Sequence, residues 1–216
     1  MEALHPPLSA GESIIIGLVA TVVAMLPLWW APVEHLSTIT HEAAHALLAV
    51  ILGLTVTGII LRRNHDGATG VLGEGLRFVL VGIIGYLGPS LFGLGAARLI
   101  SLGEPVAVLW MLVILLVLVL FLLGRSFGCF SVPIGIALVY LVLRYADAGA
   151  EVVAAYGVTW SLLLSGLRTA VAHGADAGDA HSLRRLTHLP RGLWSLLWLA
   201  GTVAALIVGG KLLVLG

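Results

Sequence analysis

His41-Glu42-Ala43-Ala44-His45 lies inside an apolar stretch, residues 39–61, that is long enough to cross a lipid bilayer. Ionisable side chains inside such a stretch are energetically costly, and by default they mark a functional site. On a helix, residues four apart share a face, so His41 and His45 can present their imidazoles to one metal ion. The stretch therefore predicts a membrane helix that carries a metal site.

The composition extends this interpretation to the whole chain. Its 216 residues are 60% hydrophobic and 10% charged, and the mean hydropathy is +1.11, far above the usual range of soluble domains. We expect an all-α polytopic membrane protein that forms one domain over residues 1–216. Six or seven transmembrane helices are predicted, and in the six-helix version residues 152–171 enter the membrane and return. The apolar runs lie near residues 13–30, 39–61, 77–100, 106–124, 127–146, 152–171 and 193–215.

Charge and cysteine usage exclude several classes of function. The formal net charge is zero, so no basic surface predicts a nucleic acid partner. A single cysteine, Cys129, excludes an internal disulfide and a cysteine-based zinc site. The lipid bilayer is the partner that the composition does predict.

Basic residues near the ends of membrane helices favour the cytoplasmic side. With seven helices and a cytoplasmic N-terminus, eight basic residues fall on the inner side and three on the outer side. We therefore expect an integral membrane protein with its N-terminus in the cytoplasm. The inner set is Arg62, Arg63, Arg77, Arg125, Arg168, Arg184, Arg185 and Arg191, and the outer set is Arg98, Arg144 and Lys211.

The His41–His45 motif has the spacing of helical zinc metalloproteases. In that chemistry zinc lowers the pKa of a water to about 7, and a neighbouring carboxylate removes its proton. Glu42 is placed to act as this general base. From the composition of the chain, roughly 0.01 matches to the motif are expected by chance. The alternative to a metal site is a cluster of polar side chains that join neighbouring helices by hydrogen bonds.

Catalytic zinc usually has three protein ligands and one open position, so a third ligand must come from elsewhere in the chain. The segment of residues 172–192 is the best placed to supply it. For His41 and this segment to meet, one of two things must hold. Either the motif helix spans about residues 33–60, which puts His41 and His45 about 12–18 Å deep, or residues 172–192 fold back into the membrane. The candidate ligands outside the motif are Asp66, Asp147, Glu151, Asp176, Asp179, His65, His173, His181 and His188.

Three blocks of the chain resemble the site-2 protease family of intramembrane zinc metallopeptidases, in its compact bacterial, peptidase M50B-like branch. They are the His41–His45 motif, the sequence Gly85-Tyr86-Leu87-Gly88-Pro89, and the block Asp179-Ala180 with Leu183, Leu186, Thr187, Pro190, Trp194 and Trp198 behind it.

The resemblance implies one Zn²⁺ per chain, held by His41, His45 and Asp179, with Asp176 as the other candidate for the third ligand. It implies Glu42 as the catalytic base and a role for Gly88 and Pro89 in substrate binding. It also implies a bacterial plasma membrane location and, as substrate, a membrane protein that is cut in or near a transmembrane segment.

Residues 62–75 are a polar, glycine-containing connection with two interpretations. One is a plain loop. The other is a short hairpin whose edge pairs with an extended substrate, because a helix must unwind before its peptide bond can be cut.

Two other classes of function compete with the protease. One is a catalytically silent membrane scaffold that binds partners, against which the intact Glu42 argues. The other is a metal transporter, which would need further carboxylates or histidines along a path through the membrane.

Overall fold

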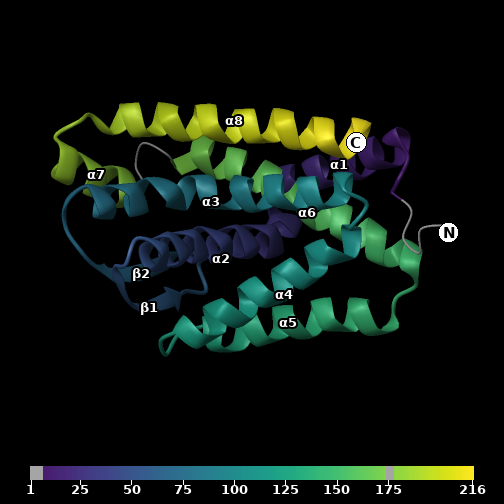
Figure 1. The fold of residues 1–216 in the computed structure, drawn as a ribbon, viewed down its shortest axis with the longest axis horizontal. Helices are drawn as coiled ribbons and strands as arrows, with labels where there is room; N and C mark the ends of the chain where they lie inside the picture. Colours follow the sequence, from purple (N-terminus) through teal and green to yellow (C-terminus); the bar gives the residue numbers. More distant parts are fainter. Residues whose placement is uncertain (1–6, 174–177) are drawn as a thin grey trace.

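The computed structural model describes residues 7–173 and 178–216, without the side chains of residues 25, 27–31 and 173. Along these residues the chain forms α1 (Ala10–Met25), α2 (Pro27–Ile51), β1 (Thr55–Leu61), β2 (Gly67–Leu72), α3 (Gly75–Ser101), α4 (Pro105–Leu122), α5 (Gly128–Tyr145), α6 (Ala148–His173), α7 (Gly178–Thr187) and α8 (Arg191–Leu215). In Figure 1, α3 lies between α2 and α8, and it contacts both of them as well as α6. The helices α4 and α5 pair beside this group.

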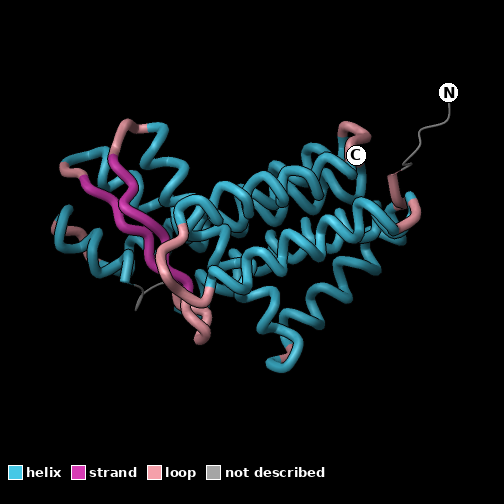
Figure 2. Tube along the Cα trace, turned by 90° about the horizontal axis from the view of Figure 1, so that it is seen from below, coloured by secondary structure: helices cyan, strands magenta, loops and turns pink. Residues whose placement is uncertain are grey.

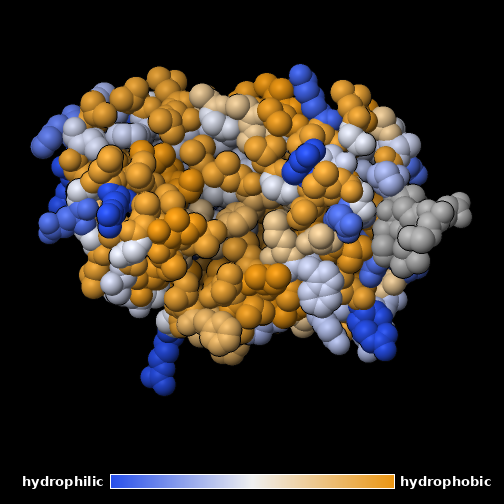
Figure 3. All heavy atoms as spheres, in the orientation of Figure 1, coloured by the Kyte–Doolittle hydropathy of each residue, from blue (hydrophilic) through white to orange (hydrophobic). Residues whose placement is uncertain are grey.

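The helices are those of a polytopic membrane protein, as predicted. Five of them, α3, α4, α5, α6 and α8, are long and apolar enough to cross a bilayer. Large apolar side chains on their outer faces are exposed, for example Phe121 at 83% and Phe130 at 71%, where lipid would cover them. Figure 3 shows that hydrophobic residues dominate this face of the molecule and that hydrophilic residues gather mainly toward its two ends.

The first predicted run, residues 13–30, is broken in the structure. The helix α1 ends at Met25, and α2 begins at Pro27 after the extended residue Leu26, with φ −90° and ψ 117°. Proline lacks a backbone N–H and pushes the preceding residue out of the helical region. The break therefore follows from Pro27, and α2 begins earlier than the predicted residue 33.

The predicted end of the motif helix near residue 60 is wrong. The helix α2 ends at Ile51, and Gly53 has φ +72°. The amide of Gly53 donates to the Val50 carbonyl at 3.0 Å and the amide of Leu54 to the Ala49 carbonyl at 2.8 Å, the paired bonds of a Schellman cap. The β-branched residues that follow form strand β1 instead.

The connection between α2 and α3 is a β-hairpin, as in the second of its two interpretations, although β1 lies before the predicted residues 62–75 and pairing with a substrate stays a prediction. β1 and β2 pair antiparallel, with Ile59 opposite Thr69, and they lie side by side toward one end of the bundle (Figure 2). The outer edge of β1 is covered, because Ile59 bridges to Leu123 and its carbonyl accepts from the Gly124 amide at 2.8 Å. Within the described residues no further strand pairs with the outer edge of β2.

The helix α7 folds back against the bundle. Its apolar residues Ala180 and Leu183 are fully buried in a cluster with Tyr86, Trp194 and Trp198. Leu183 lies over Gly82 of α3, where an added Cβ would meet its Cδ2 at 2.9 Å. This short helix brings the residues just after the undescribed segment 174–177 to the side of α3.

The orientation prediction put the N-terminus and the eight inner basic residues on the same side of the membrane. The helix α1 begins at the end of the bundle opposite the hairpin and α7 (Figure 1). The basic residues of the predicted inner set belong to the hairpin turn, the start of α3, the α4–α5 connection, the last turns of α6, α7 and the start of α8. The start of α1 and this basic set therefore do not share one side, contrary to the prediction.

Candidate metal centre

The centre is built on the face of α2 that packs against α3. His41 and His45 lie one turn apart, and the intervening Ala43 and Ala44 are buried, with 4% and 5% exposure. Small side chains at these positions let α3 approach α2 closely. Gly85 of α3 lies opposite the two imidazoles, and it is the eleventh residue of a 27-residue helix. At 1.5 Å per residue the centre therefore lies roughly 15 Å along α3.

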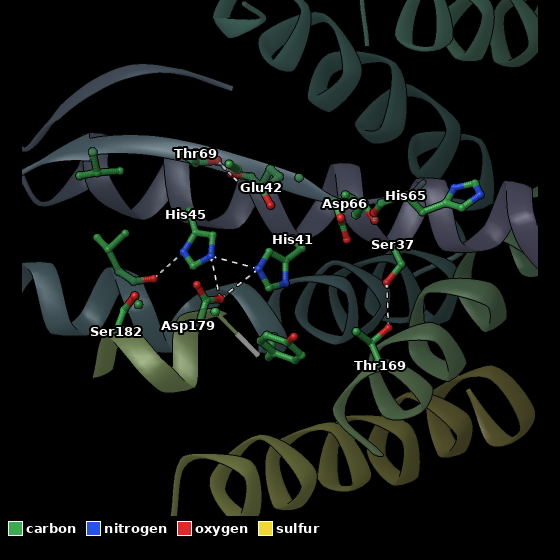
Figure 4. A pocket seen from close by; sticks show the side chains of 18 of the residues that line it. Ser37, His41, Glu42, His45, His65, Asp66, Thr69, Thr169, Asp179 and Ser182 are labelled. Carbon is green, nitrogen blue, oxygen red and sulfur yellow. Dashed lines mark hydrogen bonds and ion pairs between the residues drawn. The ribbon is translucent and has the colours of Figure 1, made fainter. Parts of the chain in front are cut away.

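His41, His45 and Asp179 converge on one point (Figure 4). The Nε2 atoms of the two histidines are 3.1 Å apart, and the Asp179 Oδ2 lies 3.1 Å from His41 Nε2 and 3.2 Å from His45 Nε2. Ligands held about 2.0–2.1 Å from a tetrahedral zinc would be about 3.3–3.4 Å apart. The three donor atoms thus form a triangle of nearly the size that one zinc ion needs, and their chemistry, two imidazoles and a carboxylate, suits it.

A second contact fixes which nitrogen of His45 faces this point. His45 Nδ1 lies 2.6 Å from the Val81 carbonyl of α3. Because a carbonyl can only accept, Nδ1 carries the proton and donates it. The lone pair of the neutral ring is then on Nε2, directed at the other two ligand atoms, which is the usual arrangement of a metal-binding histidine.

Gly85 provides the space for the centre. An added Cβ would overlap His45 Nε2 and would lie 2.5 Å from His45 Cε1 and 2.7 Å from His41 Nε2. No side chain other than hydrogen fits there without moving the two imidazoles. The sequence showed Gly85 only as a member of a glycine-rich block, so its role at the centre was not predicted.

Asp179 lies in the first turn of α7. Its side chain is 26% exposed, and its Oδ2 faces the Nε2 atoms of both histidines. The carboxylate is thus placed to act as the third ligand.

Glu42 lies beside the centre, against the hairpin. Its side chain is buried, with 4% exposure, and its Oε2 accepts a hydrogen bond from the Thr69 hydroxyl at 2.6 Å. A second threonine, Thr38, donates to the His65 carbonyl at 2.6 Å and joins α2 to the hairpin turn. The hairpin is therefore docked on the motif helix at two points.

A cavity of about 850 Å³ opens over these residues. It is lined by the motif face of α2, the whole length of β2 up to Val71, and parts of α3, α6 and α7. Tyr86 forms part of its wall, with its ring edge-on to His41 at 4.9 Å between centroids and stacked on Trp198 at 4.4 Å. A polar cavity of this size can hold water next to the three ligand atoms.

The structure thus brings together four of the predicted site residues, His41, Glu42, His45 and Asp179. Asp176 lies outside the described residues. His181 is exposed on α7 and does not belong to the cluster of ligand atoms. Two arrangements were expected to let His41 meet the segment of residues 172–192, and the structure has features of both. The helix α2 begins before residue 33, and α7 folds back against the bundle.

Gly88 and Pro89 are buried and do not line the cavity, so their role in substrate binding stays a prediction. A Cβ at Gly88 would meet the Ala44 Cβ at 2.6 Å and the Thr40 carbonyl oxygen at 2.9 Å. Gly88 is thus a point of close contact between α2 and α3.

Gly88→Ala is expected to destabilise the protein by about 1–3 kcal/mol, because the new methyl group forces apart two helices that meet through backbone. Thermal unfolding in detergent measures this as a lower Tm. Gly157→Ala is the control, since nothing lies within 4 Å of a Cβ at that position of α6. Equal Tm values for the two variants would contradict the assigned packing role.

The fold and the centre together define an integral membrane protein with a candidate metal site of two histidines and one aspartate. Comparison with protein families matches residues 14–209, and the chain belongs to the Peptidase M50B-like family. Comparison with curated proteins and with solved structures gives no match.

Proposed function

We propose that this protein is an intramembrane zinc metallopeptidase, which cuts a peptide bond in or near a transmembrane segment of another membrane protein. The observation that carries the proposal is the triangle of His41, His45 and Asp179 beside the buried Glu42. Membership of a peptidase family supports it. The site opens into a cavity among helices of which several are long and apolar enough to cross a bilayer, which supports a substrate of this class.

The three ligands would hold one Zn²⁺, which when bound supplies a Lewis acid that polarises the scissile carbonyl and activates water. Glu42 would take the proton of the attacking water and pass it to the nitrogen of the leaving amine. His45 is kept in the correct tautomer by the Val81 carbonyl. Glu42 and Tyr86 both line the cavity beside the ligands.

The hairpin suggests how the substrate is presented. The outer edge of β1 is occupied by residues 123–124, whereas β2 faces the cavity. An unwound segment of substrate would therefore pair with β2, whose backbone groups would satisfy its amides and carbonyls. This arrangement would hold the scissile bond extended next to His41 and Glu42.

We propose further that the protein resides in a bacterial plasma membrane, with the basic end of the bundle in the cytoplasm. The hairpin and α7 then lie on the cytoplasmic side. The start of α1 lies at the other end of the bundle.

The two competing classes fit the site less well. A silent scaffold has no need for a buried glutamate held by a hydrogen bond next to a set of metal ligands. A transporter needs a series of sites along a path. Within the described residues, the cluster of His41, His45 and Asp179 is the one group that could hold a metal ion.

The test is to express the wild type and Glu42→Gln in a bacterial host and to compare new protein termini in the membrane fraction by mass spectrometry. We expect the wild type to create termini within transmembrane segments and Glu42→Gln to create none. The control is Glu104→Gln, an exposed glutamate at the start of α4. Identical sets of termini from the wild type and Glu42→Gln would overturn the proposal.

A further inference from the structure

The hydroxyl of Thr69 is the group through which the hairpin contacts the Glu42 carboxylate. It lies 2.6 Å from Glu42 Oε2 and 3.1 Å from the backbone carbonyl oxygen of Glu42. A hydroxyl has one proton to give, and the charged carboxylate at the shorter distance is the stronger acceptor. Thr69 therefore donates to the side chain of Glu42.

The position of Thr69 follows from the geometry of β2. Side chains alternate between the two faces of a strand, and residues 67, 69 and 71 are the less exposed set, which faces α2. Gly67 leaves room for Glu42, since a Cβ there would lie 2.5 Å from Glu42 Oε1. The strand β2 thus contacts both oxygens of the carboxylate. Thr69 donates a hydrogen bond to Oε2, and the backbone of Gly67 lies close to Oε1.

A buried carboxylate needs donors that hold it in one orientation. Glu42 has 4% exposure. Among the described residues, Thr69 is the side chain that donates to it. Without this hydroxyl the carboxylate could turn about its last bonds, and a misplacement of about 1 Å at a reacting group can reduce the rate by about 100-fold.

We propose that Thr69 is a positioning residue, which orients Glu42 for proton transfer and so couples the base to the strand that receives the substrate. This inference rests on the proposed function. The side chain of Thr69 faces α2, whereas substrate would pair with the backbone edge of β2. Loss of the hydroxyl therefore affects the chemical step and leaves substrate binding intact.

The test uses Thr69→Val, which keeps the shape and removes the donor, and Thr69→Ser, which keeps the donor. Thr57→Val is the matched control, because Thr57 is an exposed threonine on β1 of the same hairpin. The probe is a detergent-solubilised peptide that contains a transmembrane segment cut by the wild type in the membrane experiment. We measure kcat, KM and zinc content for each variant, together with amide hydrogen exchange of residues 67–72.

We expect kcat of Thr69→Val to fall about 10- to 100-fold with KM and zinc content unchanged. Exchange in residues 67–72 is expected to stay at the wild-type rate, which separates loss of orientation of Glu42 from loosening of the hairpin. Thr69→Ser is expected to restore kcat to within about threefold. An unchanged kcat in Thr69→Val, or a kcat in Thr69→Ser as low as that of Thr69→Val, would overturn the proposal. If instead wild type and Glu42→Gln cleave nothing, the proposed function itself fails, and the role of Thr69 fails with it.

Discussion

Asp179→Ala is expected to lower zinc affinity by more than about 100-fold, because second-shell changes alone typically cost 10- to 100-fold and this change removes a ligand. The His41 and His45 imidazoles would then face each other without the carboxylate that lies 3.1 and 3.2 Å from their Nε2 atoms. Zinc content after dialysis against a zinc buffer measures the effect. Proteolysis is expected to be lost in parallel.

His181→Ala is the control for this prediction. His181 lies two residues beyond Asp179 on α7 and is exposed, and it was among the candidates for the third ligand. We expect its replacement to leave zinc content at the wild-type level. A loss of zinc in His181→Ala together with full zinc in Asp179→Ala would show that the ligand set is misassigned.

Gly85→Ala is expected to reduce zinc affinity on a similar scale, although glycine binds no metal. The new methyl group would lie within 2.7 Å of His41 Nε2 and overlap the ring of His45. Both imidazoles also contact other groups of α3, His45 the Val81 carbonyl and His41 the Tyr86 ring. The rings therefore cannot retreat without losing those contacts, and the ligand triangle must open.

Gly95→Ala is the control on the same helix, where nothing lies within 4 Å of an added Cβ. It is expected to bind zinc normally and to be as stable as the wild type or slightly more, because alanine favours a helix over glycine by about 1 kcal/mol. Isothermal titration with zinc compares the two variants. Normal zinc affinity in Gly85→Ala would contradict the close packing of α3 against the centre.

The histidine pair of the candidate centre could be predicted from the sequence because its signal is local. His41 and His45 share a helix face through spacing alone, and the apolar runs define α3, α4, α5, α6 and α8 almost to their ends. Asp179 was one of nine candidates for the third ligand, and only the resemblance to a family singled it out. Its arrival at the centre depends on α7 packing through Ala180 and Leu183 onto α3, a long-range contact without periodic signal.

The errors have identifiable physical causes. The apolar run through residue 61 concealed the end of α2, because Gly53 and the β-branched residues after it form a cap and a strand that are as hydrophobic as a helix. The orientation prediction counted residues 13–30 and 39–61 as two complete crossings. In the structure α1 and α2 together lead from the end of the bundle opposite the hairpin to the hairpin (Figure 1), so they make one passage along the bundle and not two.

The role of Thr69 was equally out of reach from the sequence. A threonine between glycines in a polar connection is typical of a turn. Its contact with Glu42 depends on the docking of the hairpin against α2, where Thr38 also donates to the His65 carbonyl of the turn. Side chains that position a neighbour, unlike ligands, have no characteristic spacing.

Zinc content of the purified, detergent-solubilised protein tests the central claim most directly, by comparison of the wild type with a His41→Ala/His45→Ala double variant that retains its helical content. We predict close to one zinc per wild-type chain and none in the double variant. A folded wild type that binds no zinc when zinc is supplied, or a double variant that binds as much as the wild type, would contradict the metal centre and the peptidase function built on it.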